Sequence, residues 1–274
     1  MAETATPDLE AYFARISYEG PRTVSLATLD GIHQHHAQTI PFENLDIQLG
    51  RRIAVDLAAI ERKLVHEKRG GYCFEHNTLL AAVLRTLGFQ VTTHLGRVRW
   101  QIPVETPTAL THQVLRVEIA DAGPHLADVG FGSMSLFRPL RWEFDVAQPG
   151  CLEPRRLVRR GELIAHQARI GETWSDVYVF SPEPVPGVDI EVANWFTCAH
   201  PQSPLRQNLR ASRTLADRRY TLLNSEFNIR HADGRVERRT IATAEELLAI
   251  LAEYFGLHFP PGTRFGPPGS PWPR

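Results

Sequence analysis

The spacing of apolar residues changes abruptly at Gly88, and this change limits the chain to a fold that joins a helical part to a β part. Before Gly88, apolar residues recur every three or four positions, the period of an amphipathic helix. After it, short segments rich in β-branched and aromatic residues alternate with turns such as Asp121-Ala122-Gly123-Pro124. We therefore expect an α+β protein whose helices come first.

The helical part is predicted to hold four helices. Apolar periodicity places them at residues 8–16, 25–39, 56–66 and 73–87. The last is the most regular, and Gly88 suits the left-handed conformation that ends many helices. We expect residues 1–88 to form a helical bundle.

The middle of the chain is predicted to be an antiparallel β-barrel. Its expected strands lie in residues 90–100, 112–119, 125–131 and 157–180. The Pro-rich residues 181–186, followed by Gly187, then suggest a linker. We therefore assign residues 89–190 to the barrel.

The last part, residues 191–274, is predicted to combine a linker with a smaller α/β unit. Asp233-Gly234 lies between two strand-like segments, residues 220–230 and 235–241, which indicates a hairpin. Thr243 and Glu246 have the spacing of a capping box, which predicts a helix through Tyr254. The Pro- and Gly-rich residues 260–274 are expected to be extended.

Charge and composition exclude several classes of protein. The formal net charge is -1, which gives no support for nucleic-acid binding. We interpret the local pairs Arg155-Arg156 and Arg238-Arg239 as solvated surface. Residues 1–20 carry several acidic side chains before any apolar run, unlike a signal peptide, and the strongest apolar run, residues 79–84, is too short to span a membrane.

The cysteines indicate a reducing compartment. Three cysteines suit a reducing environment, and no CxxC pair suggests a zinc site. We interpret Cys151 and Cys198 as structural or surface thiols. The sequence thus predicts a cytoplasmic protein without a metal, a nucleic-acid partner or a membrane anchor.

Cys73 is the first candidate for chemistry. Gly70 and Gly71 allow a tight turn with positive φ, and the helical periodicity begins directly after them. Cys73 is therefore expected in the first turn of a helix, where free amide groups and the helix dipole favour a nucleophilic thiolate. The alternative is a buried structural cysteine.

A nucleophilic cysteine needs a base and a group that orients it. His112 begins one β-segment and Asp128 lies in the next, so antiparallel pairing can bring them together. Asp128 is flanked by apolar residues, and a buried carboxylate needs a partner. We therefore predict a triad of Cys73, His112 and Asp128.

Other polar residues near this pattern fit different roles. His33, His35 and His36 lie in a helical stretch without a matching acidic cluster and are interpreted as surface positions rather than metal ligands. Glu43 and Arg69 are predicted to form a bidentate bridge that braces the turn before the cysteine.

Four motifs together resemble the arylamine N-acetyltransferases, in a pattern that runs over most of the chain and looks bacterial in type. They are Pro41-Phe42-Glu43-Asn44-Leu45, Arg69-Gly70-Gly71-Tyr72-Cys73-Phe74-Glu75, Thr111-His112 and Asp128-Val129-Gly130-Phe131-Gly132. Asn194-Trp195-Phe196 and His200-Pro201-Gln202-Ser203-Pro204 resemble the family's linker before its last domain.

The resemblance implies a fold and an activity. The fold is an N-terminal helical bundle, a central β-barrel and a C-terminal α/β lid, with a catalytic core like that of cysteine proteases. Cys73 would be the acetylated nucleophile, His112 its base and Asp128 the orienting group, while Thr111, Phe131 and Gly132 would line the substrate pocket.

The implied reaction is ping-pong acetylation, in xenobiotic metabolism, of arylamines and arylhydrazines. Acetyl-CoA would be the co-substrate, and no cofactor would be permanently bound. Three alternatives remain at this point: an amide synthase of natural-product pathways, a cysteine hydrolase or transglutaminase-like enzyme, and a non-catalytic binding module.

Overall fold

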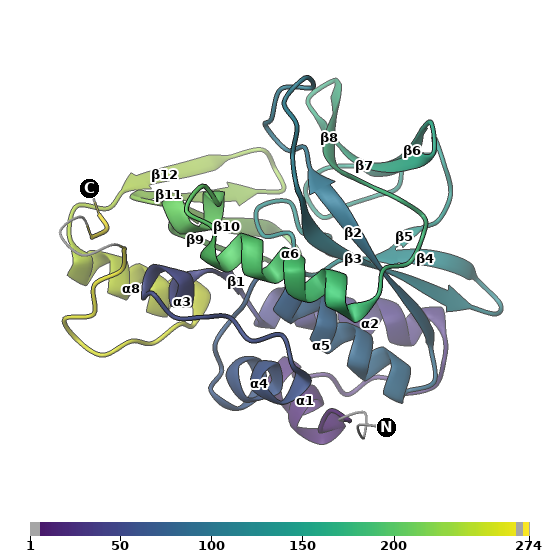
Figure 1. Cartoon of the computed structure of the whole chain (residues 1–274), viewed down its shortest axis with the longest axis horizontal. Coiled ribbons are helices and arrows are strands. Elements are labelled where there is room, and N and C mark those ends of the chain that lie inside the picture. Colours follow the sequence, from purple (N-terminus) through teal and green to yellow (C-terminus); the bar gives the residue numbers. More distant parts are fainter. Residues whose placement is uncertain (1–5, 267–270, 274) are drawn as a thin grey trace.

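Capping side chains set the ends of the helices in the N-terminal region. The computed structural model describes residues 6–266 and 271–273 (Figure 1). Asp8, Ser25 and Asp56 each accept a backbone N–H three residues later, which fixes the first turn of a helix. The helices of this region are α1 (Leu9–Ile16), α2 (Leu26–Thr39), α3 (Leu45–Gln48), α4 (Leu57–Glu61) and α5 (Cys73–Thr86).

The four predicted helices are confirmed, with two differences. The short helix α3 was not predicted. The predicted helix at residues 56–66 changes at Arg62 into a wider π-helical turn, Arg62–His66. Gly88, with φ of 96°, follows α5 as predicted. The buried faces of α1, α2 and α5 form one core, which includes Tyr12, Leu29 and Leu80 and continues into the barrel through Leu115.

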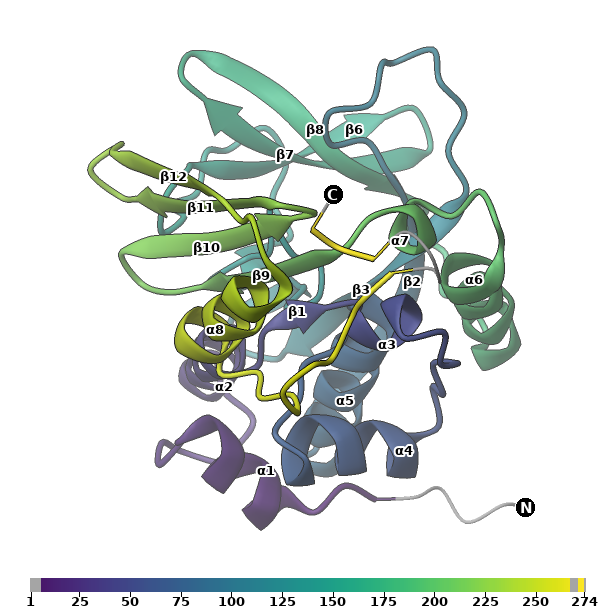
Figure 2. The same cartoon turned by 90° about the vertical axis from the view of Figure 1, so that its left-hand side faces the viewer.

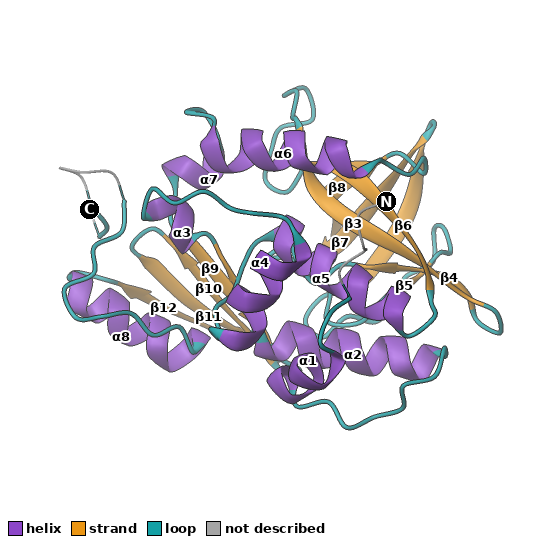
Figure 3. Ribbon diagram, turned by 60° about the horizontal axis from the view of Figure 1, so that its bottom comes forward, coloured by secondary structure: helices purple, strands orange, loops and turns teal. Residues whose placement is uncertain are grey.

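Seven antiparallel strands form a curved, nearly closed sheet beside the helices, as predicted (Figure 3). Their spatial order is β5-β4-β3-β2-β8-β7-β6. The strands are β2 (Gln90–Val98), β3 (Leu110–Ile119), β4 (Gly123–Ala127), β5 (Leu140–Arg141), β6 (Arg155–Arg160), β7 (Leu163–Ile170) and β8 (Thr173–Phe180). The predicted strand at residues 125–131 ends at Ala127, so Asp128 begins a loop.

The C-terminal region is a five-stranded sheet covered by a helix. The strands follow the order β1-β9-β10-β11-β12, and β1 comes from the N-terminal part of the chain (Figure 2). The elements are β1 (Phe42–Glu43), β9 (Arg210–Thr214), β10 (Arg218–Leu223), β11 (Glu226–His231), β12 (Val236–Thr240) and α8 (Ala244–Phe255).

Turn residues explain the local structure of this region. The hairpin at Asp233-Gly234 is confirmed between β11 and β12. The single strand predicted at residues 220–230 is wrong, because Asn224 adopts φ of 57° and turns the chain between β10 and β11. The Thr243 hydroxyl caps α8 and Gly256 ends it, as predicted.

Helix α6 (Gly187–Ala199) runs from the barrel toward the C-terminal sheet, where α7 (Pro204–Gln207) follows it (Figure 3). The predicted boundary at residue 190 falls inside α6, and β1 ties the first region to the last sheet. The division into residues 1–88, 89–190 and 191–274 therefore stays a proposal. Residues 1–5, and residues 267–270 and 274 of the predicted tail, lie outside the described residues.

Candidate active site

Cys73 is the first residue of α5, and close backbone contacts hold the turn before it. The Glu43 N–H donates to the Gly71 carbonyl at 2.7 Å, and the Gly71 N–H donates to the Pro41 carbonyl at 3.3 Å. A Cβ on Gly70 would lie 2.1 Å from the Pro41 oxygen. Because positive φ is found at neither Gly70 nor Gly71, close approach and not positive φ explains these glycines, which corrects the prediction.

The other two predicted residues lie next to Cys73. His112, on β3, contacts Asp128 with 2.8 Å between Nε2 and Oδ2. The Cys73 thiol donates to the carbonyl of Thr111, the residue before His112, at 3.4 Å. The exposed fractions of Cys73, His112 and Asp128 are 5%, 2% and 0%. Three residues far apart in the sequence thus meet in a site almost closed to solvent.

Asp128 is held in its charged form by several donors. Its Oδ1 accepts the Asn77 side-chain amide and the Gly130 N–H, each at 3.0 Å. Burial alone would raise the pKa of Asp128, but His112 and these hydrogen bonds lower it well below its usual value. Asn77 lies one turn after Cys73 on α5, and its place in the site was not predicted.

His112 is shifted in the opposite direction. Burial disfavours its charged form, but the charge of Asp128 and hydrogen bonds to Asp128 and Cys73 raise the pKa of His112 to about 10. At neutral pH the ring therefore carries two protons and can stabilise a neighbouring thiolate.

The predicted pocket residues border this site. The Phe131 ring meets the His112 ring edge-on, with 4.9 Å between centroids. Gly132 has φ of 86° and packs against the Phe42 ring, while Thr111 is half-buried on β3. Gly130 was not predicted to matter, yet a Cβ there would lie 2.7 Å from the Cys73 Cα. Only glycine lets the loop approach the cysteine so closely.

Comparisons with known proteins agree with this geometry. A family model described as N-acetyltransferase matches residues 25–263. An arylamine N-acetyltransferase of Mycolicibacterium smegmatis is 38% identical over 253 residues, covering 91% of this chain and 92% of the relative. One from Escherichia coli is also 38% identical, covering 92% and 89%. The chain belongs to the arylamine N-acetyltransferase family.

Solved structures of the family have the same fold as this arylamine N-acetyltransferase. The enzyme from M. tuberculosis superimposes with a TM-score of 0.88 at 38% identity, covering 91% of this chain and 93% of that one. A structure of the Mycobacterium marinum enzyme in complex with CoA gives the same TM-score and identity, covering 91% and 92%. The α+β architecture and the enzyme class predicted from the sequence are therefore confirmed.

Salt bridges brace the turn of this N-acetyltransferase. Arg69 donates through Nε and Nη2 to the same Glu43 oxygen, at 3.0 and 2.7 Å. The predicted bridge is present with two donors, and both meet one oxygen because the other Glu43 oxygen accepts the Leu45 N–H at 2.7 Å. On the far side of the turn, Glu75 accepts the Tyr72 N–H at 3.0 Å and pairs with Lys63 at 2.7 Å.

The interpretation of the α2 histidines as surface residues is wrong. His33 and His36 are fully buried, while His35 is half-buried. The Pro41 carbonyl can only accept, so His76 Nε2–H donates to it at 3.2 Å. His76 Nδ1 then accepts from His36 Nε2–H at 2.8 Å, and His36 Nδ1 accepts the Tyr12 hydroxyl at 2.8 Å. This polar chain ties α1 and α2 to the nucleophile helix.

Removing the first donor of this chain should destabilise the enzyme. In Tyr12→Phe, the buried Nδ1 of His36 loses its partner, which costs about 1–3 kcal/mol of unfolding free energy. Urea denaturation would measure it. Tyr254→Phe, on α8, makes the same exchange at a partly exposed position away from this chain and serves as the comparison. An unchanged unfolding free energy in Tyr12→Phe would contradict this account of the chain.

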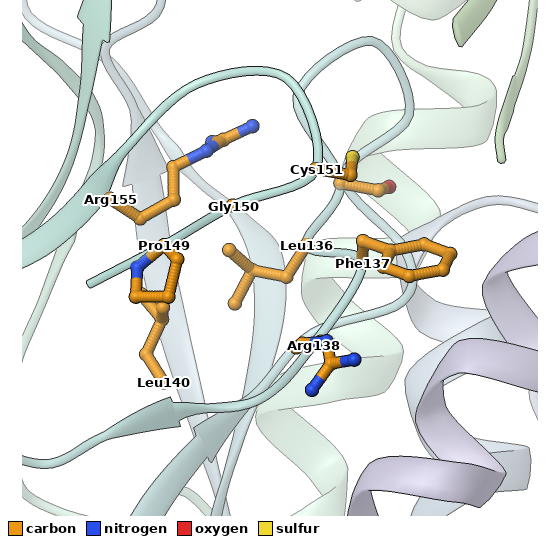
Figure 4. A pocket seen from close by; sticks show the side chains of 9 residues that line it. Leu136, Phe137, Arg138, Leu140, Pro149, Gly150, Cys151 and Arg155 are labelled. Atoms are coloured by element: carbon orange, nitrogen blue, oxygen red, sulfur yellow. The ribbon is translucent and has the colours of Figure 1, made fainter. Parts of the chain in front are cut away.

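Two further predictions concern residues away from the triad. Arg155 is buried and pairs with Glu153 at 3.1 Å, so its interpretation as solvated surface is wrong, whereas Arg238 and Arg239 are exposed as predicted. Cys151 lines a cavity of about 10 Å³ beside Phe137, with room for about one water (Figure 4). None of the triad residues lines that cavity.

The described residues also bear on metals and membranes. Within residues 6–266 and 271–273, no group of three or more His, Cys, Asp or Glu side chains is placed to hold a metal ion. None of the helices in this part of the chain has the length and apolar character that crossing a bilayer requires.

Proposed function

We propose that this enzyme transfers the acetyl group of acetyl-CoA to the nitrogen of arylamines and arylhydrazines through an acetyl-Cys73 intermediate. The proposal rests on the meeting of Cys73, the first residue of α5, with His112 and Asp128. The names of the relatives support the acceptor class, and the CoA complex of the M. marinum enzyme supports the donor.

In the first half-reaction, the Cys73 thiolate attacks the thioester carbonyl. A new sulfur–carbon bond forms, the bond to coenzyme A breaks, and the His112 imidazolium can give its proton to the departing thiolate. One thioester replaces another, so the step is nearly isoenergetic. Backbone N–H groups around Cys73 would stabilise the oxyanion, and one such donor is typically worth about 3 kcal/mol.

In the second half-reaction, the amine attacks the acetyl-cysteine. An aromatic amine is neutral at pH 7, so its lone pair is available. His112, now neutral, accepts the amine proton as the tetrahedral species collapses, and Cys73 leaves as a thiolate. Phe131 beside His112 would offer its ring to the aromatic acceptor. The chemistry requires acetyl-CoA as co-substrate and no permanently bound cofactor.

Initial-rate kinetics test the order of these steps. With acetyl-CoA and an arylamine both varied, a ping-pong enzyme gives parallel double-reciprocal lines. Intersecting lines would contradict the acetyl-enzyme route. Steady release of coenzyme A without any amine would instead favour a hydrolase, and failure to use acetyl-CoA would favour an amide synthase with another acyl donor.

We also propose that the reaction takes place in the cytoplasm and serves xenobiotic metabolism. Acetyl-CoA is an intracellular metabolite, and Cys73, Cys151 and Cys198 are all free thiols, which suits a reducing compartment. Activity in the soluble fraction of lysed cells, and its absence from the medium, would be the expected distribution.

A further inference from the structure

The loop that begins at Asp128 carries three of the residues that shape the site around Cys73 and His112. It follows β4, which ends at Ala127, and leads to β5, which begins at Leu140. This loop carries Asp128, places Gly130 against Cys73 and sets the Phe131 ring against His112. The position of its backbone therefore sets the geometry around Cys73 and His112.

His33 contacts this loop at two points. The Asp128 N–H donates to His33 Nε2 at 3.2 Å, and His33 Nδ1 lies 3.3 Å from the Phe137 carbonyl. An amide N–H can only donate, so Nε2 is unprotonated and Nδ1–H donates to Phe137. One neutral ring thus bridges residues nine positions apart and links both to α2.

We propose that His33 is a positioning residue that holds both ends of the loop from Asp128 to Phe137 and so aligns the triad. The proposal rests on the proposed function, in which Asp128 orients His112. A hydrogen bond between the Gly132 N–H and the Ser135 hydroxyl, at 2.7 Å, stabilises the middle of the loop, while His33 joins its ends to the helical region.

The surroundings of His33 favour the neutral ring that this role requires. The side chain is fully buried, and burial lowers the pKa of His33 to about 4, although the Phe137 carbonyl and two carboxylates act in the other direction. The acceptor at Nε2 is therefore available throughout the neutral range.

The test compares three variants with one control. His33→Leu removes both contacts, His33→Gln retains a donor and an acceptor, and His33→Asn retains them on a shorter side chain. His94→Leu is the control, because His94 is also buried and bonds a backbone carbonyl, that of Glu183, at 3.1 Å, away from this loop. Thermal denaturation of all four gives their stabilities.

The readouts are the rate of Cys73 acetylation by acetyl-CoA across pH and the rate of Cys73 alkylation by iodoacetamide at pH 7. His33→Leu should slow acetylation about 10- to 100-fold, since a displacement near 1 Å costs about that much. A looser Asp128 attracts the imidazolium less, so the basic limb of the pH profile should move to lower pH. His33→Gln should recover most of the rate.

The outcomes separate positioning from stability. If His33→Leu lowers the rate by the same factor at every pH and does not shift the basic limb, its effect is that of a purely structural change such as His94→Leu. That result overturns the positioning role. If His33→Leu does not fold, a basic limb in His33→Asn that matches the parent enzyme overturns it, and a shifted limb supports it. Alkylation needs no acyl donor, so a parent enzyme that is alkylated but never acetylated would refute the proposed function and still test His33.

Discussion

Replacing Cys73 by serine is expected to reduce acetyl transfer by about 10⁴- to 10⁶-fold while the protein stays folded. Nucleophile replacements in enzymes with such triads have effects of this size. A hydroxyl is far less acidic than a thiol, so His112 beside it cannot maintain a nucleophilic anion. Cys73 is buried, but the serine hydroxyl can donate to the same Thr111 carbonyl, so Tm should change little.

The matched control for this variant is Cys151→Ser. Cys151 lies beside a small cavity away from the triad and should retain normal turnover. Rates of arylamine acetylation and thermal denaturation curves of both variants are the measurements. More than a tenth of normal activity in Cys73→Ser would mean that another group accepts the acetyl.

Replacing Asp128 by asparagine is expected to have the next largest effect, a loss of about 10³- to 10⁴-fold in kcat/KM. In another triad enzyme, the same exchange costs about 10⁴-fold because the histidine adopts the wrong tautomer. Here the amide would face donors from Asn77 and Gly130, and His112 would lose the charge that keeps it protonated. Asp233→Asn, in the exposed turn between β11 and β12, is the control and should keep normal kinetics.

The Asp128→Asn variant should also lose a pH-dependent part of the unfolding free energy. The raised pKa of His112 contributes stability that is complete below about pH 6.5 and is lost as pH rises toward about 10. The lowered pKa of Asp128 contributes stability that is present above about pH 3.9 and is lost as pH falls further. Urea denaturation should therefore show the largest difference between parent and variant from about pH 4 to 6.5. A difference that does not vary with pH would contradict the ion pair.

Short sequence signals predicted the parts of the site that depend on local structure. The glycines before Cys73 and the periodicity after it placed the cysteine at the start of a helix. Antiparallel pairing of consecutive segments brought His112 to Asp128, because neighbouring strands in sequence pair in space. The capping residue Thr243 predicted its helix for the same local reason.

Features that depend on long-range packing were not predictable in the same way. Nothing near His33 in the sequence indicates that its partners are Asp128 and Phe137, about a hundred residues away. A histidine on an amphipathic helix has no hydropathy signal that separates a buried bridge from a surface position. The two-residue strand β1 joins the C-terminal sheet through β9, and so short a segment has no pattern of its own.

The central claim is that Cys73 carries the acetyl group between the two substrates. The most direct test is the intact mass of the purified enzyme after mixing with acetyl-CoA and no acceptor, followed by peptide mapping. We predict the gain of one acetyl group on Cys73, which disappears when an arylamine or arylhydrazine is added. An unmodified Cys73 in an enzyme that still acetylates arylamines would contradict the account.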